Sequence, residues 1–350
     1  MNVSELYSLT DWITQYVIKA AIVEKYSALE QALQRYSSPN TRGSSFETEK
    51  DSLILALKET PLLSLTKDQI AVLESLGIAD SLGSVGISKL EDLLYRNVID
   101  VADSVEKIQT IVSNLQTGIG KSDQIKAGLT GCVEPENYEI DGEILIRVTF
   151  KGRAPINNVT DFKEWGKTWY EIGRGIAMAH GQAPEDIRVV GATRGSIVIE
   201  LAVVASIAGT TSYIIMEGLK VAERILDLRL KAEQLREMKL KNTKLAAEIE
   251  ASAEEEKIEA AHRITMEVAK RIKLTTAKNA EQISILEKSV SNLLNFVERG
   301  GEIDFIAPEE DPDTKEVSSS EPSEIHLLRD RFEEIRMLEN KIALLEFKES

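Results

Sequence analysis

The sequence predicts an α+β protein that is predominantly helical. We expect an N-terminal helical unit, a small two-layer β-α-β-β unit and long C-terminal coiled-coil helices. Three observations predict this fold class. Apolar residues recur at helical spacing over most of the 350 residues. Aromatic residues make up only 5% of the chain, a low share for a β-sandwich. One stretch, 138–151, alternates with a period of two instead and is rich in β-branched residues.

Residues 1–130 are expected to form the helical domain. Residues 3–36 have the pattern of a single amphipathic helix, and Thr66 is placed to cap a later one. Ser88 is expected to cap another, and 98–115 to form the last. Proline, glycine and polar segments separate these helices, which predicts a compact all-helical unit.

Residues 131–201 are expected to form the small α/β domain. After strand 138–151 comes a helix that opens at Asp161, and short strands follow at 187–190 and 196–201. This helix carries one apolar stripe at spacings of three and four residues: Phe162, Trp165, Trp169, Ile172 and Ile176. The two tryptophans of the stripe are expected to be buried against the sheet.

Residues 202–299 are expected to form an apolar helix that continues into a coiled coil. Residues 201–216 carry no charge, and a heptad seam with 4-3-4-3 spacing follows from 221 to 235. The expected oligomerisation residues are a pair of small residues followed by this seam: Ala205, Gly209, Val221, Ile225, Leu228 and Leu235. Because the chain offers no evident cover for these residues, the pattern favours a homo-oligomer.

The C-terminal region divides at an acidic segment. Residues 300–322 contain eight acidic residues, three prolines and one lysine, which predicts a disordered linker. Residues 323–350 are expected to form a last helix with an apolar seam of its own. We expect this helix to fold back onto the similar seam at 283–297. The competing arrangement uses it to bind another subunit or another protein.

Composition limits the function classes. The chain has 42 basic and 58 acidic side chains and a formal charge of −16, which argues against nucleic acid as a partner. Cys132 is the single cysteine, so a disulfide within the chain is excluded and a reducing cytoplasm is the expected compartment. The three histidines, His180, His262 and His326, are too dispersed for a Cys/His zinc site.

Short motifs give no support to an enzyme. Gly120-Lys121-Ser122 lacks the glycine that a phosphate-binding loop has five positions earlier, and is expected to be a helix C-cap and turn. Cys132 and His180 could suggest a nucleophile and base, but nothing around them specifies that chemistry. Residues 73–94 resemble a helix-hairpin-helix only faintly. We therefore expect no catalytic residue, no metal ligand and no cofactor.

Two functions fit this pattern. The first is a non-enzymatic, self-assembling coiled-coil scaffold or signalling protein with a recognition head. Its partners would be further copies of itself and, through the C-terminal helix, another protein. The alternative is a membrane-associated effector of the defence or toxin type that docks or inserts through residues 201–216. Basic residues that follow this uncharged stretch could contact anionic headgroups.

Overall fold

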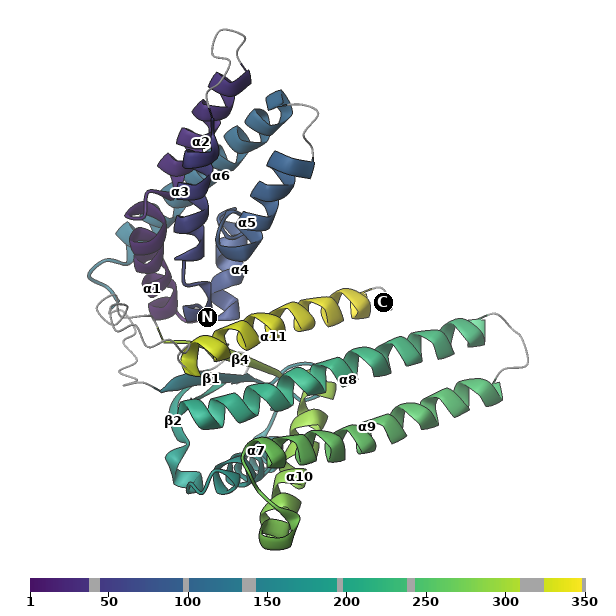
Figure 1. The fold of residues 1–350 in the computed structure, drawn as a ribbon. Coiled ribbons are helices and arrows are strands. Elements are labelled where there is room, and N and C mark those ends of the chain that lie inside the picture. Colours follow the sequence, from purple (N-terminus) through teal and green to yellow (C-terminus); the bar gives the residue numbers. More distant parts are fainter. Residues whose placement is uncertain are drawn as a thin grey trace. The chain divides into compact units, whose positions relative to one another are not determined.

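The computed structural model describes residues 1–37, 45–96, 101–133, 143–193, 198–237, 243–308 and 324–347. The chain is mostly helical (76%), as the sequence predicts, and contains a small four-stranded antiparallel sheet (Figure 1). It divides into two compact units, unit 1 (Met1–Glu139) and unit 2 (Ile140–Ser350).

The described part of unit 1 is all helical. Its α-helices are α1 (Val3–Ile13), α2 (Ile22–Ser37), α3 (Glu47–Lys58), α4 (Lys67–Ser75), α5 (Gly83–Glu91) and α6 (Val101–Leu129). Short π-helical or 3-10 turns lie between them: η1 (Thr14–Ile18), η3 (Leu62–Ser64), η4 (Ala79–Ser81) and η5 (Asp92–Arg96). The apolar faces meet in one core, in which Ile13, Tyr26, Leu57 and Leu115 are buried.

Two helix boundaries in unit 1 differ from the predictions. The single helix expected over 3–36 is two helices, because the π-turn η1 and the left-handed backbone of Ala21 (φ 55°) interrupt it. Ser88 lies inside α5 and does not cap it, since that helix already begins at Gly83.

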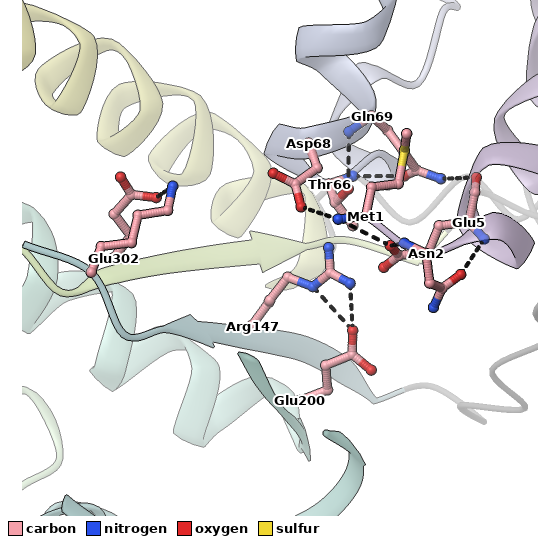
Figure 2. Close-up of polar contacts among 10 residues, drawn as sticks. Met1, Asn2, Glu5, Thr66, Asp68, Gln69, Arg147, Glu200 and Glu302 are labelled. Carbon is pink, nitrogen blue, oxygen red and sulfur yellow. Dashed lines mark hydrogen bonds and ion pairs between the residues drawn. The ribbon is translucent and has the colours of Figure 1, made fainter. Parts of the chain in front are cut away.

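The predicted cap at Thr66 is confirmed. Its side chain accepts from the Gln69 amide, and the Gln69 side chain accepts from the Thr66 amide in return. Gln69 Nε2 also donates to the carbonyl of Glu5, at 3.0 Å (Figure 2). The beginnings of α1 and α4 are therefore joined by a hydrogen bond.

The sequence predicted a helix C-cap and turn at Gly120-Lys121-Ser122. These residues lie inside α6, so this prediction is wrong. Gly118 is needed for packing. A Cβ atom at this position would lie 2.5 Å from the Leu76 carbonyl oxygen, which is too close for any side chain. The Gly-Lys-Ser triplet is therefore helical, and no phosphate-binding loop exists there.

Unit 2 is built on the sheet. Its elements are β1 (Ile144–Thr149), α7 (Val159–Ala179), η6 (Pro184–Asp186), β2 (Arg188–Thr193), β3 (Val198–Val203), α8 (Ala205–Glu237), α9 (Thr243–Arg271), α10 (Thr276–Glu298), β4 (Glu302–Ile306) and α11 (Glu324–Phe347). The strand order is β2-β3-β1-β4, and every neighbouring pair is antiparallel. The expected β-α-β-β order is present as β1, α7, β2 and β3.

Strand β4 was not predicted, because residues 302–306 lie in the segment expected to be a linker. Its central residues, Ile303, Asp304 and Phe305, are buried, and it pairs with β1 along the strand. The expected linker therefore begins with a strand of the sheet. Residues 309–322 of that prediction lie outside the described residues.

The predicted coiled coil over 202–299 is not one continuous helix. Residues 201–203 end β3, and three helices follow. Between α9 and α10 the chain turns at Lys273, which has a left-handed backbone (φ 61°). Helices α8 and α9 pack against each other as a hairpin, and α8 lies between α9 and α11 (Figure 1).

Two packing predictions need correction. Helix α11 does fold back within the chain, but it packs against α8 and β4, and not onto the 283–297 seam as expected. That seam, in α10, packs chiefly against α7 and α9. Trp165 and Trp169 are half-buried, and each forms an edge-to-face contact with Phe296 of α10. Their principal aromatic partner is therefore a helix residue that follows more than one hundred positions later.

Candidate functional site: the two edges of the sheet

The residues predicted to mediate oligomerisation lie on α8, and the chain itself covers most of them. Val221 and Ile225 are buried with Ala253 and Ala260 of α9, and Leu228 packs against this cluster. The heptad pattern therefore marks a real helix–helix seam, and its partner is α9 of the same chain.

The other three predicted residues lie towards the two ends of α8. Gly209 lies under α11, because a Cβ there would be 3.4 Å from Leu328 Cδ2. Ala205 is the first residue of the helix, and Leu235 belongs to it but its side chain is outside the described residues. The argument from uncovered apolar surface thus no longer applies to Gly209, Val221, Ile225 and Leu228.

The uncharged stretch 201–216 is also covered. It forms the end of β3 and the first three turns of α8, and residues 207–208 and 210–216 are buried. None of the described helices is both long and apolar enough to cross a membrane. The cover comes from elements that lie far away in the sequence, which is why the sequence alone did not indicate it.

Two rows of side chains cross the whole sheet, one on each face. Register pairs Val189, Leu201, Ile146 and Phe305 in an apolar row across the four strands. Neighbouring positions pair in a charged row: Gly191, Glu200, Arg147 and Asp304. Because successive residues of a strand point to opposite faces, the two rows lie on opposite sides of the sheet.

The charged row alternates in sign. Arg147 donates to Glu200 Oε1 from Nε at 3.0 Å and from Nη2 at 2.7 Å (Figure 2). Asp304 stands on the other side of Arg147 and accepts from Arg336 of α11, with Nη2 to Oδ1 at 2.9 Å. Each carboxylate in the row therefore lies beside a guanidinium group, which is the arrangement that low-polarity surroundings require.

Helix α11 covers the β4 edge, where both rows end. Phe332 stacks on Phe305, with ring centroids 4.8 Å apart and an interplanar angle of 13°. Arg336 binds Asp304 and also donates to the Phe305 carbonyl at 3.4 Å. Nearer the start of the helix, Arg329 donates to the Pro308 carbonyl at 2.6 Å. One helix thus ends the apolar row, ends the charged row and binds main-chain carbonyls at this edge.

The β2 edge is open in the described structure. No described strand lies beyond β2, Val189 is 67% exposed, and Val190 is 36% exposed. A β-bulge between Val189 and Gly191 leaves Val190 without a register partner on β3. Arg188 at the start of the strand pairs with Glu143. This edge therefore presents small or β-branched residues and unpaired main-chain groups, which is the surface that a further strand can join.

The sequence could not identify this open edge, because the strand order depends on β4. The strand expected at 187–190 extends further, because Gly191 and Ala192 also belong to β2. The alternation of Ile303 and Phe305 was the available signal for β4. The acidic residues around this strand favoured the prediction of a linker instead.

The reactive residues named from the sequence belong to different units. Cys132 is exposed and belongs to unit 1. His180 ends α7 in unit 2, with Nε2 2.6 Å from Thr210 Oγ1. Within the described ranges, no group of three or more His, Cys, Asp or Glu side chains is arranged to hold a metal ion. In comparisons with known proteins, no family model, curated protein or solved structure matches this chain.

Proposed function

We propose that this chain is a non-enzymatic assembly protein whose copies associate edge to edge through β2, with unit 1 as the recognition head. The observation that carries the proposal is the contrast between the edges of one sheet. Helix α11 covers β4, whereas Val189 on β2 is 67% exposed. The expected homo-oligomer is retained as a proposal, but its contact surface moves from the α8 seam to β2.

The physical argument is that an edge strand carries unpaired N–H and C=O groups, which another strand can satisfy. Strand β2 contains no proline and no acidic residue, so neither a missing amide nor like-charged carboxylates oppose its pairing with itself. Two copies of β2 can pair antiparallel about a twofold axis. Because α11 covers the other edge, such pairing stops at two copies and does not grow into a fibre.

The bulge is the feature that acts against this proposal. Bulges are one of the means by which edge strands avoid unwanted pairing. In β2 the bulge lies at Val190, between the paired positions Val189 and Gly191. A paired edge must therefore accommodate the irregularity, and the oligomeric state in solution decides between a protected edge and a used one. No observation in the structure favours the membrane-associated alternative over assembly.

Light scattering coupled to gel filtration tests the proposal on the full chain. We expect the wild type to run as a dimer at micromolar concentration. Val189→Lys should shift it towards the monomer, because a lysine on each copy places like charges at the edge. The matched control is Leu55→Lys in unit 1, where Leu55 is 60% exposed and therefore similarly accessible. A monomeric wild type, or an equal effect of both variants, would contradict edge pairing.

A further inference from the structure

Three helices of unit 2 meet around the ring of Tyr213. This residue lies on α8 and is buried, and its hydroxyl donates to Glu267 of α9. The guanidinium carbon of Arg271, the last residue of α9, lies 3.8 Å from the ring centroid. Arg331 of α11 approaches the same centroid at 5.8 Å. The two guanidinium groups are therefore no further apart than the sum of these two distances.

Neither arginine has a carboxylate partner within ion-pair distance in the part of the chain that the structure describes. Arg331 Nη1 donates to the Gly209 carbonyl at 2.7 Å and to Ser212 Oγ at 3.3 Å, and both acceptors are neutral. Its Nε and Nη2 atoms, and all the donors of Arg271, have no hydrogen-bond partner among the described residues. Arg271 is exposed and Arg331 is half-buried, so the donors of Arg271 can be reached from solvent.

The acidic side chains nearby are engaged elsewhere. Glu217 and Glu334 both pair with Lys220, at 3.2 and 3.0 Å. Glu267 accepts the hydrogen bond of the Tyr213 hydroxyl. The chain has 58 acidic and 42 basic side chains, yet the two arginines beside the Tyr213 ring keep positive charge that an anion could bind.

The electrostatic state of the cluster is consistent with that description. Burial, followed by the nearby positive charge of Arg271, lowers the pKa of Arg331. Burial, followed by the hydrogen bond to Glu267, raises the pKa of Tyr213 to about 12. The tyrosine therefore stays neutral at physiological pH and does not offset the two positive charges.

We propose that Arg271 and Arg331 form a binding site for the phosphate or diphosphate group of a soluble small molecule. Guanidinium groups bind phosphate oxygens through paired, charge-assisted hydrogen bonds, and the planar group stacks on aromatic rings while doing so. The guanidinium carbon of Arg271 lies over the Tyr213 ring, and the Gly209 carbonyl and Ser212 hydroxyl hold Nη1 of Arg331. The donors that remain belong to two guanidinium groups beside the same ring, Arg271 from α9 and Arg331 from α11. This site involves no residue of β2.

Isothermal titration with inorganic phosphate and with pyrophosphate, against sodium chloride at matched ionic strength, tests this site. We expect saturable binding of one anion per chain, with pyrophosphate at least as tight because it can reach both arginines. Arg271→Gln and Arg331→Gln should each weaken binding by about tenfold or more. Arg271→Lys keeps the charge but loses the fork of donors, so it should fall between the wild type and Arg271→Gln.

The matched control is Arg174→Gln, since Arg174 is an exposed arginine on another helix, α7. This variant should bind phosphate like the wild type. Binding that is absent in the wild type, or that Arg174→Gln weakens as much as Arg271→Gln does, would overturn the proposal.

Vesicles that contain phosphatidic acid form a second arm of the experiment. Binding to vesicles without binding to free phosphate would assign the site to a lipid headgroup, and would overturn a soluble ligand. The Val189→Lys variant should bind phosphate normally, so failure of this site and failure of edge pairing are distinguishable.

Discussion

The two edges of the sheet in unit 2 differ in how far they are covered. At the β4 edge, Phe332 and Arg336 of α11 end the apolar row and the charged row, respectively. At the β2 edge, the apolar row ends in Val189, which is largely exposed, and the charged row ends in Gly191, which has no side chain. Both rows are therefore covered at the β4 edge and open at the β2 edge. A further strand can be added to the sheet beside β2.

The difference follows from the side chains that the two strands offer. Strand β4 supplies Phe305 and Asp304, a large apolar group and a charge that a helix can pack against and bind. Strand β2 supplies Gly191 and Ala192, which give a helix little to contact.

The largest expected effect concerns the covered edge. Replacing Phe332 with Ala removes a side chain that is 1% exposed and stacks on Phe305. We expect the free energy of unfolding of unit 2 to fall by about 3–5 kcal/mol, as for other large aromatic truncations in cores. Urea unfolding, followed by tryptophan fluorescence, measures this change in the free energy of unfolding. In a Trp12→Phe background, only the tryptophans of unit 2 remain as reporters.

Met337→Ala is the control for that experiment, because Met337 lies on the same helix and is 61% exposed. It should change the free energy of unfolding by less than about 0.5 kcal/mol. A similar loss in both variants would mean that α11 contributes helix propensity and does not cover the edge through Phe332.

The second effect tests the charged row. Arg336→Met leaves the Asp304 carboxylate, whose side chain is 6% exposed, without this partner. We expect a loss of about 2–3 kcal/mol in the free energy of unfolding, since removing one partner of a buried charge pair is costly. A double-mutant cycle with Asp304→Asn isolates the pair. Asp304→Asn should cost clearly less in the Arg336→Met background than alone, and additive losses would show that the two groups are not coupled.

Local sequence signals predicted much of the fold correctly. The Thr66 cap, the β-α-β-β order and the helical seam through Val221 and Ile225 all follow from patterns within a few residues. Such patterns indicate that one face of a helix or strand is apolar. They do not indicate which other element covers that face.

The partners of those faces could not be predicted for that reason. The α8 seam suggested a second chain, and the partner is the alanine-rich face of α9, at Ala253 and Ala260. The α11 seam matched that of α10 in period, yet its partners are α8 and β4. Neither edge of the sheet could be identified without β4. That strand was not predicted, because it lies in an acidic segment and pairs with β1 far away in the sequence.

A third, smaller effect probes the open end of the charged row. A Cβ at Gly191 would overlap the Glu200 carboxylate, so Gly191→Ala must displace that side chain from its position beside Arg147. We expect a loss of about 1–2 kcal/mol in the free energy of unfolding of unit 2. Gly166→Ala on α7, where a Cβ would meet nothing within 4 Å, is the control and should not destabilise. An equal response at both glycines would show that the charged row does not need the space at Gly191.

The smallest expected effect on stability is at Val189, an exposed residue of the open edge. Val189→Lys removes no buried contact, so the unfolding free energy of the isolated monomer should change by less than about 0.5 kcal/mol. Association between native copies stabilises a protein by an amount that grows with the logarithm of its concentration. The wild type should therefore unfold at higher temperature as its concentration rises, whereas Val189→Lys should not, and the two should coincide at high dilution. Thermal melts over a dilution series measure this. A melting temperature that is independent of concentration in both proteins would mean that the bulge at Val190 protects the β2 edge, and that the two edges differ only in how each is kept from pairing.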